Sequence, residues 1–192
     1  MVLSIYQDHR PHHWGYRQVF ASDSLLHDTL TGISLGYVGG NVLSALLKFP
    51  DTLLNHEFHA IVCDSIKAKK LVADEFGVKA VVGSHSDQNS MVKEASEVDV
   101  VIAMADCDDV GTAAGIVEGM KTQFEVTEKT PVLIHTSGTG VLADTSTEKK
   151  TEMIWDDKDV EQLRTIKPVA LHYPVELLFF EADTEGRHIL FF

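Results

Sequence analysis

Apolar runs of strand length alternate with amphipathic segments along most of this chain. The apolar runs occupy residues 25–30, 58–63, 79–83, 98–105 and the start of 131–140. Between them, apolar side chains recur at helical spacing in residues 41–49, 65–78, 90–96 and 110–124. A further helix is expected at about 174–182, and a final strand in 187–192. Strands joined through helices in this way predict a parallel sheet covered on both faces.

The order of these elements predicts one α/β domain. Right-handed crossovers favour a doubly wound parallel sheet, the Rossmann fold, with the first strand at its centre. The alternation begins at residue 25, so we expect an irregular N-terminal extension over residues 1–24 and a single domain over 25–192. Residues 143–158 are polar and charged, and they predict a long exposed loop.

A glycine-rich stretch, residues 31–42, lies between the first predicted strand and the first predicted helix. It contains Gly32, Gly36, Gly39 and Gly40. Glycines let the backbone turn sharply and approach a ligand closely, and the helix that follows offers unpaired N–H groups and a positive dipole end. The stretch therefore indicates a phosphate site, although glycine turns also occur at such junctions for packing alone.

Composition excludes several classes of partner. The 192 residues, 44% of them hydrophobic, suffice for one sizeable core, and 29 acidic against 16 basic residues give a net charge of -13. Nucleic acid and anionic membranes need a basic face, so neither is expected as a partner. No apolar run approaches the ~20 residues of a membrane span, and the N-terminus does not resemble a secretory signal. A cytoplasmic protein is expected.

The residues that often bind metals have no metal-site spacing here. His9, His12 and His13 lack a helical i, i+4 frame, and the acidic residues in 156–161 match no calcium loop, so we expect no metal site. Cys63 and Cys107 form no CxxC pair and are expected to be reduced, partly buried thiols.

The ends of the predicted strands converge on one crevice if the sheet is doubly wound. The second strand ends at Asp64, where a carboxylate can accept hydrogen bonds from ribose hydroxyls and repel a 2′-phosphate, which favours NAD over NADP. Asp64 is also placed to cap a helix beginning near Ser65. Ala103 and Ala105 end the fourth strand, and their small side chains suit either a bound nucleotide or helix packing.

These residues together resemble the short-chain dehydrogenase/reductase superfamily, in its extended and atypical branch of NAD-dependent epimerases/dehydratases and NmrA-like proteins. The matching pieces are LTGISLGYVGGNVLSALL, AIVCDSIKA, VVGSHSD, ASEVDVVIAMAD, HTSGTGVL and WDDKDVEQL, followed by a looser match to the end of the chain. The resemblance implies a nicotinamide dinucleotide cofactor and an oxidoreductase acting on a hydroxyl or carbonyl substrate. It also implies cofactor contacts at Gly32, Gly36, Tyr37, Val38, Gly39, Asp64, Ala103, Met104, Ala105 and Thr136, and a catalytic role for Ser137.

The chain departs from this superfamily where catalysis would occur. Its Tyr-x-x-x-Lys pair is absent, because none of Tyr6, Tyr16, Tyr37 and Tyr173 has a lysine four residues on. Trp155 stands where relatives have an aromatic hydroxyl, and an indole is neither an acid nor a base.

Three hypotheses for the function of the chain therefore stay open. They are an oxidoreductase or epimerase, a non-catalytic dinucleotide-binding sensor, and a truncated inactive relative. Ser137 either positions a substrate oxygen or is a turn hydroxyl bonded to the backbone. Relatives of that superfamily continue into a C-terminal substrate portion that this sequence lacks, so a complete site would form only in a homo-oligomer or not at all.

Overall fold

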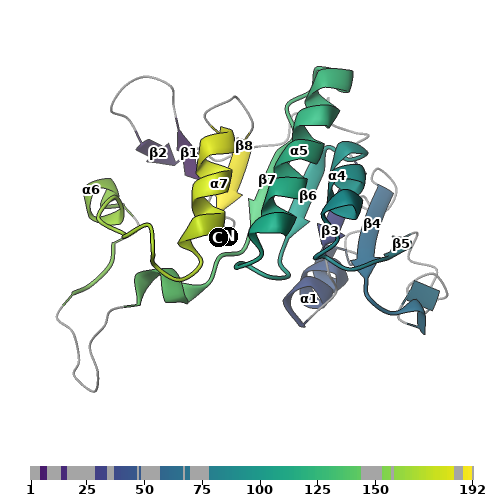
Figure 1. The fold of residues 1–192 in the computed structure, drawn as a ribbon, viewed down its shortest axis with the longest axis horizontal. Helices are drawn as coiled ribbons and strands as arrows, with labels where there is room; N and C mark the ends of the chain where they lie inside the picture. The colour runs from purple at the N-terminus through teal and green to yellow at the C-terminus, as the bar shows by residue number, and fades with distance from the viewer. Residues whose placement is uncertain are drawn as a thin grey trace.

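The structure is a computed structural model of the chain. It describes residues 5–7, 14–16, 29–33, 37–46, 48, 57–66, 68–69, 78–143, 153–156, 158–183 and 188–191. Figure 1 shows a sheet with helices packed against it. Six parallel strands make up this sheet, in the order β5 (Val78–Val82), β4 (Glu57–Val62), β3 (Thr29–Ile33), β6 (Val100–Ala103), β7 (Val132–His135) and β8 (His188–Phe191). The predicted parallel sheet is confirmed.

The first strand of this sheet, β3, lies between β4 and β6, as the crossover argument predicts. Its position along the chain differs from the predicted 25–30, because it runs from Thr29 to Ile33. Two β-branched threonines and an isoleucine suit an extended backbone better than the leucine-rich run before them. Gly32 consequently lies inside the strand, paired with Ala60 on one side and Ile102 on the other.

The first helix, α1 (Tyr37–Leu46), begins four residues before the predicted start at residue 41. Gly39 and Gly40 therefore belong to its first turns. Neither glycine stops the helix, because a glycine within a helix costs only about 1 kcal/mol relative to alanine. Residues 34–36, between β3 and α1, lie outside the described residues.

The later helices agree better with the sequence pattern. They are α4 (Gln88–Ser96), α5 (Val110–Thr127) and α7 (Tyr173–Asp183). Asp87 and Asp109 cap α4 and α5 by accepting hydrogen bonds from the backbone N–H groups of Ser90 and Thr112. Two short elements were not predicted, the 3₁₀-helix η1 (Thr139–Leu142) and α6 (Val160–Leu163).

Apolar clusters lie on opposite faces of β4. Phe58 and Ala60 pack with Val78 and with Leu43 and Leu46 of α1. The larger cluster joins the sheet to α4, α5 and α7, which lie together on one side of it in Figure 1; its most buried members include Ile61, Met91, Val101, Ile116, Met120, Leu133, Val175 and Phe179. The sheet thus carries helices on both faces in the described part of the chain.

The helices α4 and α5 approach each other closely through two glycines. A Cβ added at Gly115 would lie 2.9 Å from the Gln88 carbonyl oxygen, and one added at Gly119 would lie 2.6 Å from the Ala95 Cβ. Glycines four residues apart lie on one face of a helix, so this face of α5 fits directly against the α4 backbone.

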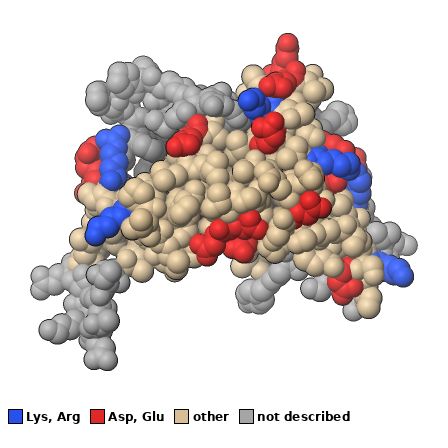
Figure 2. Space-filling model, viewed as in Figure 1, with Lys and Arg blue, Asp and Glu red and all other residues tan. Residues whose placement is uncertain are grey.

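The N-terminal segment differs from the expected irregular extension. It contains two short antiparallel strands, β1 (Ile5–Gln7) and β2 (Trp14–Tyr16), and β1 lies against β8. The histidines at positions 9, 12 and 13 lie outside the described residues, as does most of the predicted loop 143–158. No helix in the described part of the chain is long and apolar enough to cross a bilayer. On the described part of the face in Figure 2, acidic and basic side chains are interspersed without a continuous basic patch.

Candidate functional site

The carboxyl ends of the six parallel strands lie at one edge of the sheet, and α1 begins at the same edge. Gly32 lies in β3, Gly36 lies outside the described residues, and Tyr37 and Gly39 are in the first turn of α1. Val38, also in this turn, is half-exposed. The first turn of α1 contains no acidic residue. Its positive dipole end is therefore not neutralised by a carboxylate of that turn, which suits an anion.

Asp64 follows β4 and is exposed at this edge. Its Oδ1 accepts a hydrogen bond of 2.7 Å from the Ile66 backbone N–H, and its carbonyl oxygen accepts one of 3.0 Å from the Ala68 N–H. Asp64 therefore caps the helical turn that follows it, as the capping interpretation predicts. Cys63, expected to be partly buried, is exposed instead, because β4 ends one residue before it.

The residues after β6 divide between core and surface. Ala103 is buried in the cluster beneath α5 and α7, whereas Met104 is half-buried and Ala105 is exposed. A small pocket beside Ala103, Ala105 and His135 has a volume of about 10 Å³, which holds at most one water molecule.

The neighbouring strand β7 delivers Thr136 and Ser137 to the same edge. The Thr136 backbone N–H donates to the Ala103 carbonyl oxygen at 3.0 Å, so the strand pairing continues one residue past β7. The buried Ser137 Oγ has no hydrogen-bond partner among the described residues. The backbone hydrogen bond expected of a turn hydroxyl is thus not made there. An unpaired buried hydroxyl is unusual and agrees with a group that contacts a ligand.

Three side chains that the sequence did not single out as a group meet at this edge. The Cys107 Sγ lies 3.1 Å from Nδ1 of His172, and the same nitrogen lies 2.8 Å from Oδ1 of Asp108. His172 has a φ of 70°, an uncommon left-handed conformation for a residue other than glycine. Its ring packs over the loop after Ser137, where a Cβ on Gly138 or Gly140 would collide with it.

The surroundings of Cys107 keep its thiol protonated. Partial burial, followed by the nearby Asp108, Asp106 and Glu176 carboxylates, raises the pKa of Cys107 above its usual value, although a hydrogen bond from its own backbone opposes this shift. A thiolate nucleophile needs the opposite environment. Cys107 and His172 are 65 residues apart, and the packing of α7 against α5 brings the segments that precede these helices together.

The helix α7 begins directly after His172 and holds the polar part of the core. Glu176 is buried and lies 3.3 Å from the His135 Nε2 at the end of β7, and the His135 ring meets Phe179 edge-on. Tyr173 is the first residue of α7, and Leu177 stands four residues later. Trp155 donates its indole N–H to the Leu142 carbonyl oxygen at 3.1 Å, a structural contact.

Solved structures share this arrangement of strands and helices. A nucleoside-diphosphate-sugar epimerase from Agrobacterium tumefaciens is similar over 91% of this chain and 55% of its own, with a TM-score of 0.56 at 15% identity. Citrobacter sp. triphenylmethane reductase complexed with NADP(H) is similar over 86% of this chain and 48% of its own, with a TM-score of 0.52 at 18% identity. The chain therefore shares the α/β fold of these two proteins, with a parallel sheet and packed helices as the sequence pattern predicts.

The likeness to these two solved structures is one of fold. By sequence, the chain matches no family model and no curated protein. It spans about half the length of these two solved structures.

Proposed function

We propose that this chain binds a nicotinamide dinucleotide at the carboxyl edge of its sheet, as a doubly wound protein of the epimerase/dehydratase type. The N-terminus of α1 would hold the pyrophosphate, Asp64 the adenosine ribose, and the segment from Met104 to Ala105 with Thr136 the nicotinamide side. The placement of β3 between β4 and β6, with α1 starting within four residues of its end, carries this proposal. Ligands of such sheets lie where the strand order reverses.

The described residues fit such a group. The first turn of α1 has no carboxylate to repel phosphate, and the exposed Asp64 caps its helix through one carboxylate oxygen. No atom lies within 4 Å of the position that a Cβ would take at Gly40 or Gly83, so close packing within the protein does not require a glycine at either position. The Asp64 carboxylate would repel a 2′-phosphate, and we therefore propose NAD over NADP. The similar triphenylmethane reductase was solved with NADP(H), which makes this preference a point to measure.

The chemistry proposed at this edge is oxidation or reduction of a hydroxyl or carbonyl substrate. The bound dinucleotide supplies the hydride acceptor or donor for such chemistry. The chain's own contribution is Ser137, whose buried hydroxyl has no hydrogen-bond partner in the described part of the chain and is available to hold a substrate oxygen.

A second function, dinucleotide binding without turnover, is favoured by the start of α7. Tyr173 is followed four residues later by Leu177, so this helix offers no lysine to lower a tyrosine pKa. Losing a general acid typically removes ~10²- to 10⁴-fold in rate. A redox sensor needs the binding edge alone.

Titration with NADH and NADPH separates these functions. We expect thermal stabilisation by NADH that follows RT ln(1 + [L]/Kd), about 2.7 kcal/mol at a hundredfold excess over Kd. Gly36→Asp places a carboxylate in the turn before α1 and should abolish the shift. Val126→Asp adds the same charge at an exposed position near the end of α5 and should leave it unchanged.

The possible results separate binding from catalysis. No shift with either dinucleotide at millimolar concentration would refute the proposal. A shift that survives Gly36→Asp would refute the placement of the pyrophosphate. Binding without turnover of alcohols, aldehydes or nucleotide sugars would select the sensor.

A further inference from the structure

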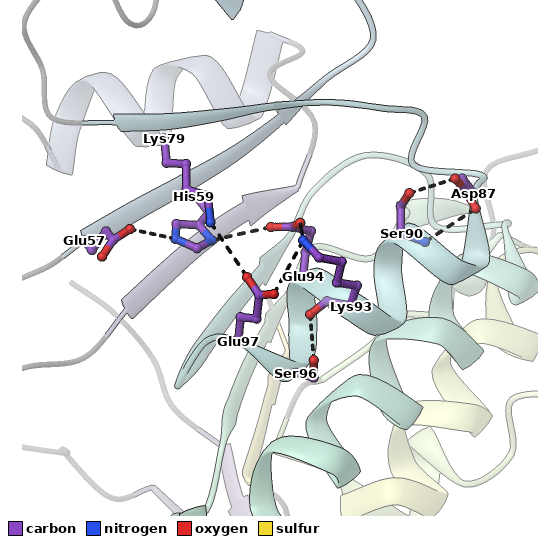
Figure 3. A network of polar contacts seen from close by, with 9 residues as sticks. All are labelled: Glu57, His59, Lys79, Asp87, Ser90, Lys93, Glu94, Ser96 and Glu97. Carbon is purple, nitrogen blue, oxygen red and sulfur yellow. Dashed lines mark hydrogen bonds and ion pairs between the residues drawn. The ribbon is translucent and has the colours of Figure 1, made fainter. Parts of the chain in front are cut away.

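A second cluster of polar side chains lies away from the carboxyl edge of the sheet. It joins His59 of β4 to Glu94 of α4 and to Glu97, the residue after that helix (Figure 3). Glu97 stands three residues before β6 begins, so the cluster lies toward the amino ends of the strands. The proposed dinucleotide site lies at the other end and uses none of these residues.

The two innermost members of this cluster are almost fully buried. His59 is 4% exposed and Glu94 is 3% exposed. Their facing atoms, His59 Nδ1 and Glu94 Oε2, have no hydrogen-bond partner among the described residues and lie 3.5 Å apart. Buried polar atoms are nearly always hydrogen-bonded, so two unsatisfied atoms that face each other require an explanation.

The separation of these two atoms fits ligands of one metal ion. An N–H···O hydrogen bond spans 2.7–3.2 Å, which is shorter than the 3.5 Å observed. Two ligands each about 2.0–2.1 Å from a tetrahedral Zn²⁺ lie about 3.4 Å from each other. A carboxylate oxygen of Glu97 lies within 4.8 Å of a ligand atom of His59 and of one of Glu94, and it supplies a third ligand.

The groups around the cluster point its donor atoms inward. Glu57 Oε1 lies 3.0 Å from His59 Nε2, as Figure 3 shows, and this contact favours the tautomer whose Nδ1 carries the lone pair. A carboxylate behind a histidine ligand is the usual outer partner in zinc sites. Lys93 Nζ donates to Glu94 Oε1 at 3.0 Å, which leaves Oε2 directed at His59.

Charge and access also suit a cation. Among the described residues, the three carboxylates of Glu57, Glu94 and Glu97 meet two ammonium groups, those of Lys79 and Lys93, so this part of the cluster has an excess of carboxylates over ammonium groups. Glu97 is 41% exposed and gives the site an open side toward solvent. Its contacts with Lys79 and Lys93, at 3.7 and 3.4 Å, are longer than direct hydrogen bonds, so its carboxylate can turn inward.

We propose that His59, Glu94 and Glu97 bind a divalent transition metal of the zinc type, with water completing the coordination. One imidazole nitrogen and two carboxylate oxygens suit Zn²⁺, whereas Ca²⁺ takes six to eight oxygen ligands. The ion would join β4 to the end of α4. It is independent of the dinucleotide, so its binding can be measured without any cofactor.

Zinc titration of the full chain, after chelator treatment and dialysis, tests this site. We expect one Zn²⁺ per chain by calorimetry and a raised melting temperature, with no comparable effect of Ca²⁺ or Mg²⁺. Glu97→Gln should weaken zinc binding about tenfold or more, and it should fold because the side chain is partly exposed. Glu118→Gln removes the same charge from an exposed position on α5 and should bind zinc as the unaltered chain does.

X-ray absorption distinguishes this cluster from the cysteine-containing one at the other edge. The bound zinc should show only nitrogen and oxygen neighbours, because a thiolate ligand would add sulfur at about 2.3 Å. A sulfur neighbour would assign the metal to Cys107 and His172 and overturn the proposal. Failure to bind zinc, or unchanged affinity in both Glu97→Gln and His59→Gln, would overturn it as well.

Discussion

Replacing Gly119 with alanine tests how closely α4 and α5 pack. In an isolated helix this change is favourable by about 1 kcal/mol, because glycine loses more backbone entropy than alanine. Here the new Cβ would lie 2.6 Å from the Ala95 Cβ and closer still to the Val92 carbonyl oxygen. Both atoms are fixed parts of α4, so the helices must move apart to admit the methyl group.

The steric cost should exceed the gain in helix propensity. Overpacking of a core typically costs about 1–3 kcal/mol. The contact with backbone oxygen, which no side-chain rotation can relieve, places Gly119→Ala in the upper part of that range. We therefore expect a net loss of about 1–2 kcal/mol, or a melting temperature lower by about 2–8 °C for a chain of this size.

Gly40→Ala is the matched control in α1. No atom lies within 4 Å of its added Cβ, so only the propensity gain applies and the chain should become more stable by about 0.4–1 kcal/mol. Urea unfolding followed by circular dichroism measures both variants against the unaltered chain. If Gly119→Ala proves as stable as Gly40→Ala, the close approach of α4 and α5 is wrong.

Three further predictions concern capping and the Cys107 contact. A hydrogen bond from the Thr112 N–H lowers the pKa of Asp109, so Asp109→Ala should cost about 1 kcal/mol at pH 7. This difference should shrink as the pH falls through the lowered pKa, and a pH-independent difference in urea unfolding would contradict it. Iodoacetamide at pH 7 should label the exposed Cys63 faster than Cys107, whose pKa is raised. The labelling rate of Cys107 should rise only at a pH above the range in which an ordinary thiol titrates. Mass spectrometry that shows faster labelling of Cys107 at pH 7 would refute this. Gly138→Ala should displace the His172 ring and speed labelling of Cys107, and an unchanged rate would show that the ring does not cover the thiol.

The hydrophobic pattern of the sequence predicts most of the sheet, because a parallel strand that is buried on both faces has a nearly continuous run of apolar residues. The strands β4, β5, β6 and β7 fall within a few residues of their expected positions. The sequence pattern misplaces both ends of the glycine-rich turn, because glycine at positions 32, 39 and 40 is typical of a turn. Pairing with β4 and β6 keeps Gly32 extended, and helical hydrogen bonding absorbs Gly39 and Gly40.

The polar clusters could not be found from spacing. His59 meets Glu94 across 35 positions and Cys107 meets His172 across 65, so packing of helices against the sheet creates both contacts. A sequence motif reports residues that share one turn, loop or helix face. It carries no signal for partners supplied by separate elements, and a histidine inside an apolar strand, such as His59, reads as an ordinary core residue.

Reduction of a carbonyl requires a proton donor beside the group that holds its oxygen, and neither Ser137 nor His172 is well suited to that role. Ser137 offers a hydroxyl, which can position an oxygen but does not release its proton readily. His172 packs over the same loop, but its Nδ1 faces Asp108 and Cys107, and its Nε2 lies against Gly138 and Gly140. The His172 side chain is 13% exposed, and both of its ring nitrogens face other groups of the protein. A measured turnover would therefore have to take its proton from a group other than Ser137 and His172.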